Sequence, residues 1–146
     1  MLTAGTTTPT PPAGTPTALA RTGWVAAANP NSGDVPANAL DGNSATRFSS
    51  GTAMTNGQTF TLDLGSARTF DQVTMDSGGS TLDYARSFTV QTSGDGATWT
   101  DVTTGSGSAA VVTSRFANQT ARWVRIVQTG SNNSWWSMSE FNLYAG

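Results

Sequence analysis

Apolar and polar residues alternate along this chain, and this period-two pattern constrains the fold more than any other feature of the sequence. In the segment 59–64 (TFTLDL) every second residue is apolar, as expected for a strand that buries one face. The same pattern predicts strands at residues 70–75, 87–93, 111–116, 122–128 and 137–144. Glycine-containing turns such as 65–66 separate these segments, and a single helical turn is predicted at Pro36–Leu40. The sequence therefore predicts an all-β sandwich or barrel.

The residue types that are absent exclude whole classes of function. The chain has 146 residues, a length typical of one domain, and it contains no cysteine and no histidine. A disulfide, a thiolate nucleophile, a zinc finger and a Ser-His-Asp triad are thereby excluded. Seven basic and nine acidic residues give a net charge of −2, which argues against a nucleic-acid partner. No apolar run approaches the roughly 18–20 residues that span a bilayer, so we expect no membrane partner.

The first 18 residues differ in composition from the rest of the chain. Residues 1–18 contain no charged side chain and four of the six prolines, interleaved with threonine. Such a segment buries too little apolar surface to offset the entropy lost on ordering it. We interpret 1–18 as a Pro/Thr-rich linker or tail and 19–146 as the folded domain.

Five segments, in this order, carry a resemblance to a known family. They are 39–50 (ALDGNSATRFSS), 60–65 (FTLDLG), 87–99 (SFTVQTSGDGATW), 121–126 (ARWVRI) and 136–141 (WSMSEF). Together they resemble the discoidin domain, also called the coagulation factor V/VIII type C domain, whose bacterial branch is the family 32 carbohydrate-binding module. The chain departs from the family pattern at Phe48, where tryptophan is usual, and we interpret Phe48 as a core aromatic residue.

The resemblance implies both a fold and a function. The fold is an antiparallel β-sandwich of the jelly-roll, galactose-binding-domain-like type. The function is that of a non-catalytic, monomeric module of a secreted bacterial protein, which holds a tethered polysaccharide-degrading enzyme on its glycan.

Two other functions compete with this one. The alternative is an adhesion or lipid-binding discoidin domain, although such domains usually have disulfides and loop tips that are apolar and basic. A small glycosidase or lyase would need a pair of acids such as Asp76 and Asp83. Their loop is rich in glycine, and nothing in the sequence indicates a deep cleft around it.

Oxygen donors gather in the short segment Asp41-Gly42-Asn43 and at Thr46. Taken alone, this spacing fits either an Asx turn beside a surface Glu140 or a site for Ca²⁺, which takes about six to eight oxygen ligands. The resemblance implies a structural Ca²⁺ that joins this loop to the last strand. Its ligands would be the side chains of Asp41, Thr46 and Glu140 and the carbonyl groups of Asn38, Asn43 and Ser139.

Trp135 and Trp136 are neighbours in a predicted strand, so their side chains should lie on opposite faces. Trp136 belongs to a segment of the family pattern and is expected in the core. Trp135 is then either an exposed platform for the apolar face of a sugar ring or a ring folded over the sheet edge. Asn133 lies close to it in a polar loop, and Trp24 is a second candidate platform.

The family's sugar site also implies contributions from the loops at residues 51–57 and 75–86. The candidates in these loops are Asn56, Asp76, Asp83, Tyr84 and Arg86, although an Asp–Arg pair could equally be a structural bridge. The histidine that many galactose-binding members place near this site is absent. We therefore expect a polysaccharide or oligosaccharide partner, with a glucan or amino-sugar polymer favoured over a galactoside.

Overall fold

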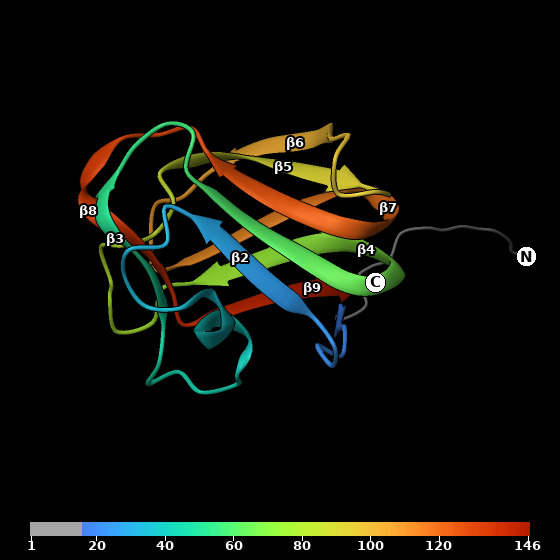
Figure 1. Ribbon diagram of the computed structural model, residues 1–146, viewed down its shortest axis with the longest axis horizontal. Coiled ribbons are helices and arrows are strands. Elements are labelled where there is room, and N and C mark those ends of the chain that lie inside the picture. Colours follow the sequence, from blue (N-terminus) through green and yellow to red (C-terminus); the bar gives the residue numbers. More distant parts are fainter. Residues whose placement is uncertain (1–15) are drawn as a thin grey trace, which may run out of the picture.

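The computed structural model describes residues 16–146, which form antiparallel strands and one short 3-10 helix (Figure 1). The helix is η2 (Pro36–Leu40), at the predicted position. The all-β antiparallel sandwich is likewise confirmed. The strands are β1 (Thr17–Ala18), β2 (Val25–Asn29), β3 (Phe48–Met54), β4 (Thr59–Asp76), β5 (Ser87–Ser93), β6 (Thr100–Ser106), β7 (Val111–Gln128), β8 (Asn132–Met138) and β9 (Glu140–Ala145).

Two strands of 18 residues, β4 and β7, organise the larger sheet. They pair with each other along most of their length. The beginning of β4 also pairs with β2, whereas its end pairs with β9. On the other side, the second half of β7 pairs with β5, and β6 follows β5 at the edge. The two halves of β4 and β7 therefore have different neighbours and contribute to opposite layers of the sandwich.

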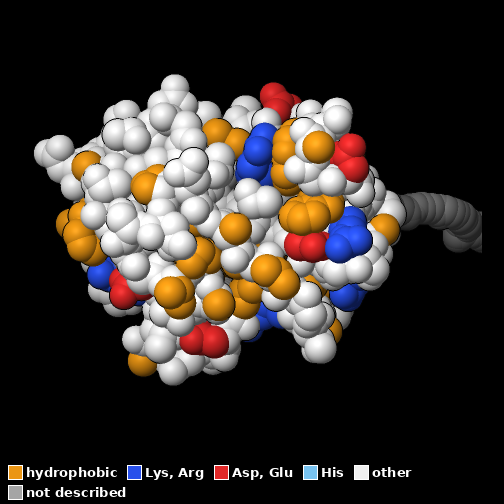
Figure 2. Space-filling view, in the orientation of Figure 1, with side chains coloured by type: hydrophobic (Ala, Val, Ile, Leu, Met, Phe, Trp, Pro, Cys, Tyr) orange, Lys and Arg blue, Asp and Glu red, His pale blue; other side chains and the backbone are white. Residues whose placement is uncertain are grey.

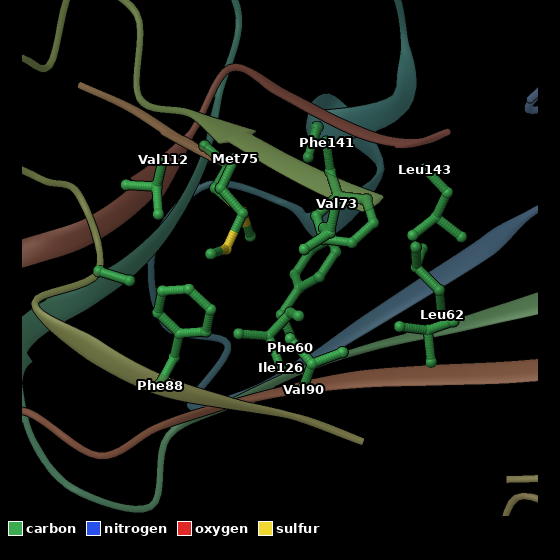
Figure 3. Close-up of a cluster of buried hydrophobic side chains, with 14 of the residues drawn as sticks. Phe60, Leu62, Val73, Met75, Phe88, Val90, Val112, Ile126, Phe141 and Leu143 are labelled. Carbon is green, nitrogen blue, oxygen red and sulfur yellow. The ribbon is translucent and has the colours of Figure 1, made fainter. Parts of the chain in front are cut away.

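Side chains from both layers meet in one hydrophobic core (Figure 3). Phe60, near the beginning of β4, packs against Phe141 on β9 with ring centroids 5.5 Å apart, which shows that the two halves of β4 face each other across the core. The alternation predicted from the sequence is confirmed for the large apolar residues of these strands, which are buried at every second position: Phe60, Leu62, Val73, Met75, Phe88, Val90, Val124, Ile126, Phe141 and Leu143.

A second, two-stranded sheet closes one end of the sandwich, at the left of Figure 1. It consists of β3 and β8, in which Phe48 pairs with Met138 and Ala53 pairs with Trp135. Phe48 is 1% exposed, and its ring centroid lies 5.2 Å from that of Phe60 and 6.0 Å from that of Trp136. Phe48 is therefore a core residue, as predicted, and it attaches the small sheet to the large one.

The structure differs from the sequence-based expectations in where strands begin and end. Residues 17 and 18, which we assigned to the linker, form β1 and pair with β9, while residues 1–15 lie outside the described part. The predicted turn at 65–66 is instead a shift of register within β4. The last predicted strand divides at Ser139 into β8 and β9. Within residues 16–146, no helix has the length and apolarity needed to cross a bilayer.

Candidate functional site

The two neighbouring tryptophans of β8 have opposite environments. Trp136 is fully buried and packs edge-on against Phe48, whereas Trp135 is 41% exposed. This difference follows from the strand itself, because successive side chains point to opposite faces. The structure thus confirms that Trp136 is in the core and that Trp135 is exposed.

Arg47, which directly precedes β3, connects Trp135 to two acidic residues. Its guanidinium carbon lies 5.7 Å from the centre of the Trp135 ring, within the range of a cation–π interaction. Its Nε is 3.1 Å from Asp34 Oδ2, and its Nη1 is 3.4 Å from Asp83 Oδ2. We call these four residues the Trp135 cluster. Hydrophobic, basic and acidic side chains also lie side by side at the left edge of Figure 2.

Asp34 is held in place because its loop lies tightly against β3. A Cβ atom at Gly33 would lie 2.3 Å from Ser49 Oγ, so only glycine allows this approach. Ser49 Oγ then donates a hydrogen bond to Asp34 Oδ2 at 2.7 Å and accepts one from the Asp34 N–H at 2.9 Å. The hydrogen bond from Ser49, followed by that from Arg47, lowers the pKa of Asp34. Its carboxylate is therefore fixed, ionised and 47% exposed.

Asp83, in the loop before β5, is held by the small sheet. Its Oδ2 accepts a hydrogen bond from Ser137 Oγ at 2.6 Å, and its carbonyl accepts one from the Ser137 N–H at 3.0 Å. Arg47 Nη1 also donates to Ser80 Oγ of the same loop at 2.6 Å. The Asp83 side chain is 17% exposed. The structure thus connects this predicted site residue to Trp135 through Arg47.

Arg86 forms a second group at the same end of the molecule. Its guanidinium carbon lies 3.9 Å from the centre of the Tyr84 ring, and its Nη1 donates to the carbonyl groups of Leu82 and Tyr84 at 2.8 and 2.9 Å. Its Nη2 is 3.4 Å from Asn132 Oδ1. The amide that meets Arg86 is therefore that of Asn132, whereas the predicted Asn133 is exposed.

The remaining predicted sugar ligands have different positions. Asn56 is exposed in the loop between β3 and β4. This loop follows Met54, the last residue of β3, which pairs with Asn132 of β8. Asp76 pairs with Glu140, and its carboxylate accepts a hydrogen bond from the Gly78 N–H at 2.7 Å. Trp24 cannot serve as an exposed platform, because its side chain is 8% exposed and belongs to the hydrophobic core.

The candidate metal ligands converge at the loop after η2. Asp41 Oδ1 accepts a hydrogen bond from the Asn43 N–H at 2.9 Å, which is an Asx turn. The Thr46 hydroxyl bonds to Asp41 Oδ2 and lies 3.0 Å from the Asn43 carbonyl oxygen. Glu140 Oε2 accepts a hydrogen bond from the Gly42 N–H at 3.1 Å. The structure therefore places oxygen donors from the loop and from β9 side by side.

We call the contact between the 41–46 loop and Glu140 the clasp. Arg21 supplies a positive charge at this clasp. Its Nη2 is 2.8 Å from Glu140 Oε1, and its Nη1 donates to the carbonyl groups of Phe141 at 3.2 Å and Ala39 at 3.4 Å. Among residues 16–146, no three His, Cys, Asp or Glu side chains form a group that could hold a metal. Two carboxylates with hydroxyl and carbonyl oxygens nevertheless match the hard-oxygen chemistry of Ca²⁺.

The other two predicted ligands have backbone positions beside this clasp. The Asn38 side-chain amide donates a hydrogen bond to the Arg47 carbonyl at 2.9 Å. The predicted Ca²⁺ ligand of Asn38 is its backbone carbonyl oxygen, which this hydrogen bond does not involve. The Ser139 N–H donates to the Asp76 carbonyl at 2.7 Å, between the end of β8 and the start of β9. Ser139 directly precedes Glu140, so the predicted ligands Ser139 and Glu140 belong to one short segment of the chain.

Similar proteins identify the family of this chain. Chitosan-binding module 2 of a chitosanase/glucanase from Paenibacillus sp. IK-5, solved with chitotriose, is 26% identical and has a TM-score of 0.69 over 86% of this chain and 97% of the module. The family 32 module (CBM32) of AlyQ, in complex with 4,5-unsaturated mannuronic acid, is 33% identical and has a TM-score of 0.68. The match covers 84% of this chain and 95% of that module.

A more distant module shares the same fold. The CBM32 from Clostridium perfringens that was solved with GalNAc-β-1,3-galactose is 23% identical, with a TM-score of 0.75 over 88% of this chain and all of that one, 100%. No curated protein sequence matches the chain. The family described as the F5/8 type C domain, in contrast, matches residues 24–141. Because this match covers most of the chain and agrees with the fold, the chain belongs to the F5/8 type C, or discoidin, domain family.

Proposed function

We propose that this domain is a non-catalytic carbohydrate-binding module that binds a glucan or amino-sugar polymer at the Trp135 cluster. The observation that carries the proposal is the exposed Trp135 ring beside fixed polar groups at one end of the sandwich. An indole ring can stack on the apolar face of a sugar, and neighbouring polar groups can bond to its substituents. The structural relatives that were solved with sugars support a carbohydrate ligand.

The proposed role is to keep a tethered, secreted, bacterial polysaccharide-degrading enzyme on its substrate. A single open site of this kind should bind in the micromolar to millimolar range, or about −4 to −8 kcal/mol. Tethering compensates for such weak binding, because it raises the effective concentration of the catalytic partner at the polymer. We expect the module itself to be a monomer.

The test is calorimetric titration of the domain with a panel of neutral, amino and acidic oligosaccharides. Trp135→Ala should weaken binding at least tenfold, or about 1.4 kcal/mol, while Trp135→Phe should retain part of the affinity. Trp99→Ala is the matched control, because the Trp99 ring packs at 4.1 Å on Arg125, outside the Trp135 cluster. Equal affinity of Trp135→Ala and the parent would contradict the site, and binding to none of the sugars would contradict the function.

We further propose a structural Ca²⁺ at the clasp, held by Asp41, Thr46 and Glu140 with carbonyl groups of Asn38, Asn43 and Ser139. The oxygen donors described above support it. A bound Ca²⁺ would neutralise the facing carboxylates and stabilise the loop against β9. If so, Ca²⁺ at about 100 times its dissociation constant should stabilise the fold by about 2.7 kcal/mol. Thermal unfolding in EDTA, Ca²⁺ and Mg²⁺, repeated with Glu140→Gln, tests this, and an unfolding temperature unchanged by Ca²⁺ would contradict it.

A further inference from the structure

The charges of the Trp135 cluster do not cancel. Two carboxylates, those of Asp34 and Asp83, share the single guanidinium of Arg47, so the cluster has a net charge of −1. Both aspartates use Oδ2 for the contacts with Arg47 and with their serine partners. Within residues 16–146, no side chain donates a hydrogen bond to the Oδ1 atom of either aspartate. Each aspartate therefore retains one oxygen that can accept a hydrogen bond from a ligand.

Asp34 is the more accessible of the two carboxylates. Its side chain is 47% exposed, compared with 17% for Asp83. It contacts the same guanidinium that lies over the Trp135 ring, so only the Arg47 side chain separates Asp34 from the platform. The contacts with Ser49 fix this carboxylate before a ligand arrives, and a group that is already ordered costs less entropy on binding.

Arg86, a second basic residue at this end of the molecule, contacts other partners. Its Nη1 donates to two backbone carbonyl groups, and its guanidinium lies over Tyr84. Its charge is therefore engaged in the loop before β5. Within the Trp135 cluster, the carboxylate of Asp34 is the most exposed ionic group, at 47% compared with 34% for the Arg47 side chain.

We propose that the Trp135 cluster selects an amino sugar with a protonated amine, and that Asp34 is the residue that determines this specificity. A protonated amine donates charge-assisted hydrogen bonds to a carboxylate, and these are shorter and stronger than those of a hydroxyl. A glucan or an N-acetylated sugar has no positive charge to offer, and a uronic acid would be repelled by the net negative charge. This inference rests on the proposed function and narrows its ligand to a cationic polymer such as a deacetylated amino-sugar chain.

The experiment is calorimetric titration with four trimers: glucosamine, N-acetylglucosamine, cellotriose and mannuronate. The parent domain should bind the glucosamine trimer about tenfold more tightly than the two neutral trimers, and this preference should shrink as salt is raised, since salt screens exposed charges. Asp34→Asn should lose about tenfold affinity for glucosamine with little change for the neutral trimers. Asp71→Asn is the matched control, because it removes the same charge from β4, where the neighbouring Gln72 pairs with Tyr144 near the C-terminus. This variant should change neither the affinity for the glucosamine trimer nor that for the neutral trimers.

The outcomes separate this inference from the proposed function. Equal binding of charged and neutral trimers by the parent would overturn the role of Asp34 but leave the carbohydrate site intact. A preference for mannuronate that Asp34→Asn strengthens would also overturn it, in favour of Arg47 as the recognition group. Binding of no trimer at all would overturn the proposed function itself. Circular dichroism and the unfolding temperature of Asp34→Asn show that the variant is folded, and an unchanged salt dependence in a folded variant would count against the proposal.

Discussion

Phe48 is the residue whose replacement should most weaken the attachment of the small sheet that carries Trp135. Its side chain is 1% exposed and contacts the rings of Phe60 and Trp136. Truncating a buried phenylalanine to alanine costs about 3–5 kcal/mol through lost apolar contact and the cavity left behind. Phe48→Leu keeps most of the volume but loses two aromatic pairs, each of which is worth about 0.5–1.5 kcal/mol, so it should cost about 1–3 kcal/mol.

Urea unfolding followed by tryptophan fluorescence measures these costs. With a slope of about 2 kcal/mol per molar urea, a loss of 4 kcal/mol lowers the midpoint by about 2 M. Such a loss is a large part of the roughly 5–15 kcal/mol that stabilises a typical domain. Val25→Ala is the control, because Val25 is 64% exposed and its replacement should change stability by less than about 0.5 kcal/mol. If Phe48→Ala and Phe48→Leu cost the same, or if either costs less than the control, the packing argument is refuted.

Three further predictions concern the loop, the charged surface and the clasp. Gly33→Ala places a Cβ against Ser49 and should cost about 1–3 kcal/mol in urea unfolding, with weaker sugar binding in titration because Asp34 is displaced. The hydrogen bond with Arg122 is the main reason that the pKa of Asp63 lies below its usual 3.8. The ionised carboxylate therefore stabilises the fold above pH 3.8, and this stabilisation is lost as the pH falls through the lowered pKa. In Asp63→Asn, the unfolding free energy measured by urea titration should fall less steeply with acidification than in the parent. Arg21→Gln removes the partner of Glu140 and two carbonyl contacts and should lower the unfolding temperature in EDTA, whereas an unchanged temperature would show that the clasp does not depend on this charge.

Much of the fold could be predicted from the sequence, because alternation reports directly on which face of a strand is buried. The segment 87–93 is a strand with the predicted ends. The pattern was less informative where β-branched residues are few, as in β3 (FSSGTAM), which it missed. It also could not show that 59–64 and 70–75 are one strand, since the continuity of β4 depends on pairing with β7 on both sides of a register shift.

The candidate site was predicted only where local sequence determines it. Trp135 and Trp136 are adjacent, so their opposite environments follow from strand geometry. Asp34 and Asp83 are far apart in the chain, and both contact Arg47 only in the folded structure, where Ser49 of β3 holds Asp34 and Ser137 of β8 holds Asp83. Neither Asp34 nor Arg47 was therefore among the predicted ligands. Trp24 was wrongly considered a platform, because no local pattern distinguishes an exposed tryptophan from one that packs in the core.

The pairing of β1 with β9 places both ends of the folded part away from the proposed sugar site. Thr17 lies opposite Ala145, so the two ends of the folded part leave the sandwich side by side. The small sheet with Trp135 lies at the other end of the molecule (Figure 1). A neighbouring domain joined through either end would therefore sit behind the module, and the bound polymer would lie in front of it. The proposed site would then face the same way whichever end were joined to a partner domain, so the order of the two domains in a chain would not change its orientation.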